Sequence, residues 1–266
     1  MNEKILKQIK SLPPLPQSVM EVQRITNDPD SSLKDLAKVI KEDPMLTANL
    51  LKAANSPLYG FTREIKNVDQ AVSLFGMSTV KGFAISFAIR NSLKFDLSAY
   101  GITEQQFHDV SIKRNALGYN WYRLKREKLD IISTDSFLID IGAVIISLIL
   151  ISEEKDEEFR KRLSQENRYH LEKEFIGATT PEITAALFKH WHFGDDLIIP
   201  MEYIDNPLKA PKYNECSASL DVLRTAVDLL NPQDKENAKK AFEKVEKYKL
   251  DKESFEKAFE IVNEGV

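Results

Sequence analysis

The sequence predicts an all-α fold, and three observations support that prediction. Glycine is scarce, at 9 of 266 residues, whereas sandwiches and barrels have many turns and therefore need many glycines. Alternation of β-branched and polar residues is rare, while apolar residues recur three and four positions apart along most of the chain. Prolines and capping residues stand where these apolar runs begin and end, which indicates a succession of helices.

The first helices begin and end at recognisable signals. Ser32 and Asp35 form a capping pair before an apolar run. Asp43, which is followed by a proline, is expected to cap the next helix. Ser56 precedes another proline and should end that helix, because a residue before proline avoids the helical region. Gly76 is expected to end the helix that follows.

Longer elements are expected in the middle of the chain. A capping box at Thr103 predicts a helix that runs to about Lys128. The apolar run 137–151 predicts one buried central helix, because it falls short of the ~20 residues that span a bilayer. The charge-rich segment 152–174 is expected to be helical and to lie on the surface.

Charge and cysteine content exclude several classes of protein. The net charge is −4, so no nucleic-acid partner is expected, although a local basic face is possible between Lys113 and Lys128. The single cysteine, Cys216, suits a reducing compartment and is expected to be a buried thiol. The N-terminus lacks the apolar core of a signal peptide. We therefore expect a cytoplasmic protein with no membrane insertion.

Three segments resemble a known family. They read LPPLPQSVMEVQRI, DPDSSLKDLAKVIKEDPMLTANLLKAANSPLYG and LFGMSTVKGFAIS, and they are similar to the opening of an HDOD domain, the HD-related output domain of bacteria. The resemblance covers roughly residues 12–207. It implies an N-terminal helical subdomain, residues 1–95, packed on an HD-like helical subdomain, residues 96–212. Residues 213–266 would form a C-terminal helical extension.

The same resemblance identifies positions where a metal ligand would be expected. HD-type phosphohydrolases use histidines and aspartates to hold metal ions, and these metal ions activate a water molecule. At the corresponding positions this chain has apolar residues and a threonine; they are Val110, Ile139, Thr180 and Ile204. We therefore expect no catalytic residue, no metal-binding residue and no cofactor.

Asp140 is retained from the HD-like pattern, as part of Ile139-Asp140-Ile141-Gly142. A carboxylate in an apolar run is costly to bury unless it is paired. The favoured interpretation is a structural carboxylate that caps or bonds a neighbouring helix. The alternative is a residual site for a metal or an anion.

The histidines do not form a ligand set. His108 and Asp109 are expected to lie on the surface of a helix. His190 and His192 are two positions apart, which spreads them around a helix axis and makes a shared metal improbable. His170 lies in the charged stretch and is expected to be solvated.

The resemblance implies a non-enzymatic bacterial regulator that signals through contacts with other signalling or regulatory proteins. Two alternatives stay open: a degenerate phosphohydrolase that acts on nucleotides, and a sensor of nucleotides or other small molecules. Residues 55–60 have two interpretations. They could form a surface for a ligand or partner, but the favoured interpretation is a structural role in the helical framework. Trp191 is assigned to the core, while Tyr203 and Tyr213 are expected to contribute to a partner or dimer interface.

Overall fold

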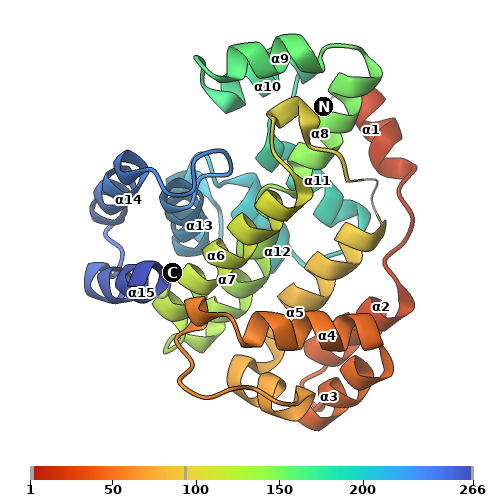
Figure 1. Cartoon of the computed structure of the whole chain (residues 1–266), viewed down its shortest axis with the longest axis vertical. Helices are drawn as coiled ribbons and strands as arrows, with labels where there is room; N and C mark the ends of the chain where they lie inside the picture. The colour runs from red at the N-terminus through yellow and green to blue at the C-terminus, as the bar shows by residue number, and fades with distance from the viewer. Residues whose placement is uncertain (1–2, 93–94, 265–266) are drawn as a thin grey trace.

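Helices are the only regular elements among the described residues, as the all-α prediction requires (Figure 1). The computed structural model describes residues 3–92 and 95–264, and no strand occurs within these ranges. The first helices have the following bounds: α1 Glu3–Lys10, α2 Gln17–Asn27, α3 Leu33–Glu42, α4 Pro44–Ala54, the 3-10 helix η1 Pro57–Tyr59, and α5 Val68–Ser92.

The remaining elements form the HD-like part and the C-terminal part. In the HD-like part the bounds are η2 Ser98–Tyr100, α6 Glu104–Tyr122, α7 Arg126–Leu138, α8 Ile141–Ser152, α9 Asp156–Leu163, α10 Arg168–Ile176, α11 Thr180–His190, α12 Asp195–Glu202 and η3 Pro207–Lys209. The C-terminal helices are α13 Asn214–Ala226, α14 Lys235–Lys247 and α15 Lys252–Glu264.

The N-terminal helices α2 to α5 form one group, which packs on the HD-like part through the contact of α5 with α7 (Figure 1). The helix signals read from the sequence are confirmed there. Ser32 and Asp35 form a reciprocal capping box, and the Asp43 carboxylate accepts from the Leu46 amide at 3.0 Å. Helix α1 lies apart from this group and packs against α8 and α11, where it buries Ile5 and Ile9.

Gly76 interrupts α5 with φ of 76° and ψ of 174°. This left-handed φ strains any residue with a Cβ atom, so glycine suits the position. The expected helix end at Gly76 is therefore confirmed as a sharp kink, after which a second helical stretch continues to Ser92.

Two expected helices of the middle region have different bounds in the structure. The helix from residue 104 ends at Tyr122 rather than near Lys128, because the chain turns and the Lys125 amide bonds the Tyr122 carbonyl at 2.7 Å. The expected helix 137–151 is two helices, α7 and α8, which meet at Asp140. The apolar periodicity continues across this junction, so it did not reveal the break.

Two helical stretches are long and apolar enough to span a membrane by length and composition alone, Val68–Ile89 and Arg126–Ser152. In their most apolar windows, 61% and 89% of the residues are buried inside the protein. The first stretch contains the Gly76 kink and the second contains the Asp140 junction. Both supply core surface to the packed helices, since α5 and α7 lie against each other.

The C-terminal helices complete the core. α13 packs on α7 and α6, and α15 packs along α6, where the Trp121 indole donates to the Asp251 carbonyl at 3.0 Å. Cys216 on α13 is buried as expected, and burial raises the pKa of its thiol to about 12. A neutral thiol is a poor nucleophile, so a structural role fits this residue.

Asp135 on α7 provides a stability test of this core. It is fully buried, and neither carboxylate oxygen has a hydrogen-bond partner among the described residues. Burial, together with nearby Asp196, raises the pKa of Asp135 well above its usual value. Between the unfolded and folded pKa values the folded state holds the extra proton, so stability falls as pH rises.

We predict that Asp135→Asn stabilises the protein by roughly 1–3 kcal/mol at pH 8 and has little effect near pH 4, because it removes an unpaired buried carboxyl that resists ionisation. Urea denaturation at both pH values measures this difference. Asp30→Asn, at an exposed position, is the control. A stability gain that is the same at both pH values would contradict the assignment.

Candidate functional site

Asp140 lies at the centre of a buried cluster of ionised side chains. It stands at the junction of α7 and α8 and is 1% exposed. Its Oδ2 accepts from Nη2 of Arg114 on α6, and its Oδ1 accepts from Nη2 of Arg168 on α10, each at 2.8 Å. The side chain makes no capping bond to α8. The favoured structural interpretation is therefore confirmed, because Asp140 bonds two neighbouring helices through their arginines.

The two arginines decide the charge of Asp140. Burial opposes ionisation, but the positive charges of Arg168 and Arg114 outweigh it and hold the pKa of Asp140 below its usual value. Arg114, which is 1% exposed, also donates through Nε and Nη2 to the Val227 carbonyl at 3.3 and 2.8 Å. The carboxylate thus stays ionised and fixes both guanidinium groups.

Glu172 extends the cluster on α10. The Nε atom of Arg168 lies 3.7 Å from its Oε1. The carboxylate also accepts from the Tyr100 hydroxyl at 2.9 Å, and from the amide and hydroxyl of Thr180 at 2.6 and 2.7 Å. Burial raises the pKa of Glu172, although Arg168 and these donors oppose the shift. The segment 152–174 is therefore not wholly on the surface as expected, because it inserts Arg168 and Glu172 into the core.

An aromatic ring joins this cluster to a second ion pair. The Tyr169 ring lies 4.5 Å from the guanidinium carbon of Arg168 and 4.9 Å from that of Arg224 on α13. Arg224 in turn pairs with Asp221 at 2.7 Å and Asp205 at 2.6 Å. Cation–π contacts of this kind add to the charge pairing when water is excluded.

The close packing of α8 on α11 explains a glycine beside Asp140. A Cβ atom at Gly142 would lie 2.4 Å from the Thr180 carbonyl oxygen, which is too close for any side chain. The Gly142 amide donates instead to the Thr184 hydroxyl at 3.1 Å. Glycine is required here by the approach of the two helices.

The donor set around Asp140 does not fit a metal ion. Both of its oxygens accept from guanidinium groups, whose positive charges would repel a bound cation. Val110, Ile139 and Ile204 are buried apolar side chains, and Thr180 is bonded to Glu172. No group of three or more His, Cys, Asp or Glu side chains gathers at metal-binding distances in the described ranges 3–92 and 95–264.

The histidines lie apart from this cluster. His108 is buried rather than on the surface as expected, and its ring lies 5.8 Å from that of Phe87. It faces inward on α6, whereas the adjacent Asp109 is exposed. His170 and His192 are exposed and His190 is half-buried. The prediction that both residues lie on the surface is therefore wrong for His108, because α6 turns that side of the helix toward the core, and it is confirmed for Asp109.

The burial of Arg114, Arg168 and Glu172 was not predicted from the sequence, which counted Arg114 with a possible basic face although it is 1% exposed. Arg114 stands within an apolar-periodic helix, and that position was the available signal, since an arginine on a core face needs a buried partner. Arg168 and Glu172 are four positions apart, which suits a pair on one helix face. Their partner in the core, however, comes from a distant segment that periodicity does not reveal.

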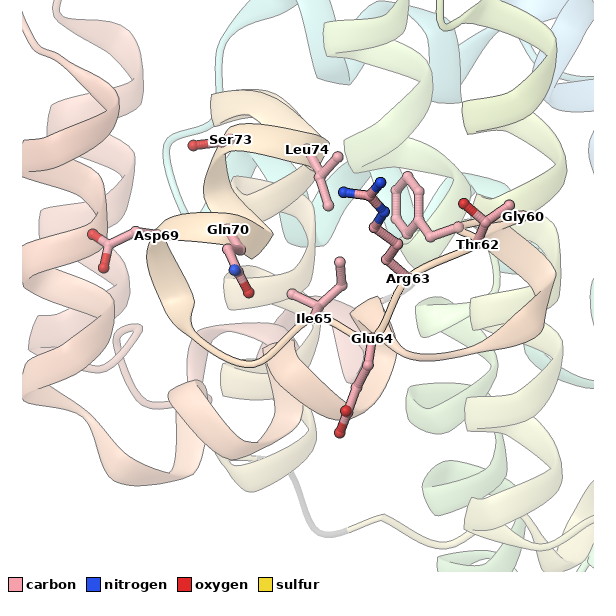
Figure 2. A pocket seen from close by; sticks show the side chains of 10 residues that line it. Gly60, Thr62, Arg63, Glu64, Ile65, Asp69, Gln70, Ser73 and Leu74 are labelled. Atoms are coloured by element: carbon pink, nitrogen blue, oxygen red, sulfur yellow. The ribbon is translucent and has the colours of Figure 1, made fainter.

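A second candidate region is a groove formed by residues 60–74, between the end of η1 and the first half of α5 (Figure 2). Its volume is about 580 Å³. Phe61, Ile65 and Leu74 supply apolar surface, and Leu74 is 43% exposed. In Figure 2 the Arg63 side chain extends toward Leu74, whereas Glu64 points away from it.

A cluster of aromatic rings lies beside this groove. Tyr59, Phe61, Phe75 and Tyr119 form a cluster of rings with centroids 4.8 to 6.2 Å apart. The Tyr119 hydroxyl also donates to the Leu74 carbonyl at 3.1 Å. Phe61, in the groove wall, therefore packs against a cluster of aromatic rings.

The acidic side chains at the groove are already paired. Lys41 binds both oxygens of Asp69 at 2.7 and 2.8 Å, and Lys66 lies 3.8 Å from Glu64. Arg63 has no ion-pair partner among the described residues. An uncompensated positive charge thus stands beside an apolar groove.

The segment that precedes the groove has a structural role. The Asn55 side chain bonds the Leu51 carbonyl and both backbone groups of Ile65, at 2.8 to 2.9 Å. Tyr59 is buried, and its hydroxyl donates to Asn115 at 2.8 Å. The framework interpretation of residues 55–60 is confirmed for these two side chains.

The aromatic residues near residue 200 divide between core and surface. Trp191 belongs to the core as predicted, and Phe193 is buried beside it. Tyr203 is half-buried, and Tyr213 is 37% exposed. The proposed interface role of Tyr203 and Tyr213 stays a prediction.

Comparison with protein families gives one match over most of the chain. The family model described as HDOD domain matches residues 12–207. Among curated proteins, an uncharacterized protein of Treponema pallidum (strain Nichols) is 30% identical over 82 residues, which are 31% of this chain. The match spans 16% of that relative's length.

Solved structures share the fold along the full chain. A virulence factor of Campylobacter jejuni subsp. jejuni is 27% identical with a TM-score of 0.62, and the match covers 100% of both chains. A protein of Shewanella amazonensis SB2B, provisionally named a phosphohydrolase, is 23% identical with a TM-score of 0.66, covering 99% of this chain and 98% of its own. A provisionally named signal transduction protein of Marinobacter aquaeolei VT8 is 18% identical with a TM-score of 0.69, covering 99% of this chain and 63% of its own.

We predict that Asp140→Asn destabilises the protein by about 3–5 kcal/mol at pH 7, because it leaves two buried guanidinium groups without their counter-charge. Urea denaturation measures the loss. Glu253→Gln, in an exposed pair with Lys257, is the control and should change stability by less than about 1 kcal/mol.

The lowered pKa of Asp140 also sets a pH window. The stabilisation by this carboxylate is present above its unfolded pKa of about 3.9 and is lost as pH falls through the lower folded value. If Asp140→Asn and Glu253→Gln lost the same free energy of unfolding at pH 7, a structural role for the pairing of Asp140 with the two arginines would be contradicted.

Proposed function

Since the chain belongs to the HDOD family, we propose that it is a non-enzymatic signalling module that acts through contacts with other signalling or regulatory proteins. The observation that carries this proposal is the pairing of Asp140 with Arg114 and Arg168. The name of the Marinobacter aquaeolei relative, a signal transduction protein, agrees with it.

Metal-dependent hydrolysis needs an open coordination position and carboxylates or imidazoles that can bind the metal. Here the retained carboxylate is committed to two cations, and the surrounding side chains are apolar or already hydrogen-bonded. This supports a framework role for the former catalytic centre. The protein would then act by binding, with no chemical step.

The groove of residues 60–74 is the contact surface that we favour. It combines apolar surface at the exposed Leu74 and the half-buried Phe61 with the cation of Arg63, which has no ion-pair partner among the described residues. These features suit a peptide segment that inserts an apolar side chain and places a carboxylate on Arg63. The Tyr203 and Tyr213 surface is the second choice, because its aromatic residues are more dispersed.

We also propose that the protein works in the cytoplasm, without membrane insertion or nucleic-acid binding. A single buried cysteine suits a reducing compartment. The net charge of −4 gives little attraction to nucleic acid.

Purified protein should retain no iron, manganese or zinc after dialysis, and should hydrolyse no nucleotide or cyclic dinucleotide above the rate without protein. Elemental analysis and a phosphate-release assay with added Mg²⁺, Mn²⁺, Fe²⁺ or Zn²⁺ test both expectations. Chelator-sensitive hydrolysis that co-purifies with the protein would overturn the proposal in favour of a degenerate phosphohydrolase.

Leu74→Asp and Arg63→Glu should each weaken association with native partners at least tenfold, because the first puts a charge on the apolar surface and the second reverses the recognising charge. Affinity capture followed by titration of the captured partner measures this effect, with the melting temperature as a folding check. Tyr213→Glu is the comparison at the second surface. Loss of partners in Tyr213→Glu alone would place the contact surface near residue 213 instead.

A further inference from the structure

Two cavities adjoin α6 outside both regions described above. One, of about 310 Å³, lies between the C-terminal half of α4 and α6. The other, of about 270 Å³, lies between α6 and the C-terminal helices α13 to α15. Both have Lys113 and Gln233 in their walls. We call the pair the α6 crevice.

The two parts of the α6 crevice differ in character. The part under the C-terminal helices has apolar side chains such as Leu117, Val227 and Phe259 in its wall, together with the charged Asp234 and Lys235. The part beside α4 has polar groups that can donate hydrogen bonds, including Asn49 and Gln105. Lys113 lies in the wall of both the more apolar part and the polar part.

The charge of Lys113 is poorly compensated. The side chain is half-buried, and its Nζ donates to the neutral Oδ1 of Asn263 at 3.1 Å. No carboxylate of the described residues pairs with it, and burial lowers the pKa of its ammonium group. A cation that is partly withdrawn from water without a counter-charge is costly, so an anion beside it would be stabilising.

Two carboxylates line the crevice, and each accepts a hydrogen bond from a group other than Lys113. Asp109, one turn before Lys113 on α6, accepts from Nε2 of Gln105 at 2.7 Å. Asp234 caps α14 by accepting from the Glu236 amide at 2.9 Å. Lys52, in the wall of the polar part, has no partner among the described residues and adds a second positive charge.

We propose that the α6 crevice binds a small organic anion, with its carboxylate or phosphate ester beside Lys113 and its apolar body in the part lined by Leu117 and Phe259. The polar part, of about 310 Å³, reaches the range of roughly 300–1,000 Å³ that is usual for ligand sites, and the more apolar part, of about 270 Å³, lies just below it. A few polar groups beside a mostly apolar chamber are also typical of such sites. This site is separate from the protein-contact groove and does not depend on it.

The α6 crevice shares a backbone group with the buried cluster. The carbonyl of Val227, in the wall of the apolar chamber, accepts from Arg114, whose Nη2 also binds Asp140. An anion in the crevice would therefore lie against the segment that holds Arg114 in place.

Three probes with the same apolar body test the proposal: 2-naphthoate, 2-naphthyl phosphate and the neutral 2-naphthol. Isothermal titration at pH 7.5 should show saturable one-to-one binding of at least one anion, at least tenfold tighter than 2-naphthol. The two anions distinguish a carboxylate ligand from a phosphate ester. Lys113→Met should reduce the preference for the anion to less than threefold, while Lys239→Met, at an exposed position on α14, should keep it.

The folding of the variants is measured in parallel. Lys113→Met removes an uncompensated half-buried charge, so its melting temperature should equal or exceed that of the wild type. Equal affinities for 2-naphthol and the anions, binding of none of the probes at millimolar concentration, or an unchanged preference in Lys113→Met would each overturn the proposal. These results leave the protein-contact proposal unaffected, because its variants lie in the groove of residues 60–74.

Discussion

The pairing of Asp140 with Arg114 and Arg168 is the contact on which the arrangement of the HD-like helices depends. It joins the α7–α8 junction to α6 and α10, three segments that are distant in the sequence. Withdrawing three charges from water is costly, and the cost is offset only while all three partners are in place. We therefore expect the pairing to favour one arrangement of these helices more than it adds net stability.

The same pairing supports our proposal that the protein acts without metal chemistry. In a metal site, a cation holds converging carboxylates and imidazoles. In this protein two guanidinium groups supply the positive charge, and apolar side chains such as Ile139 and Ile204 fill positions where the resemblance places metal ligands. The centre can thus keep its carboxylate as a framework element after its ligands are replaced.

Helix α6 connects this centre to the rest of the protein. Arg114 points to Asp140, while the preceding residue, Lys113, lines the α6 crevice. Tyr119, further along the helix, supports the floor of the groove at residues 60–74. One helix therefore carries side chains to the buried centre and to both proposed binding regions, because successive helix positions point about 100° apart.

The sequence by itself determined the fold class, most helix ends in the N-terminal part and the retention of Asp140. These depend on local signals: caps at Ser32 and Asp43, prolines at helix starts, and apolar spacing. Tertiary structure alone decided the break at Asp140, the inward turn of His108 and the burial of Arg168 and Glu172. The apolar pattern at residues 137–151 is compatible with one helix or two, and a charged segment such as 152–174 is ordinarily solvated. Only the partners supplied by distant helices make it favourable to bury those charges, and such partners leave no periodic signal in the sequence.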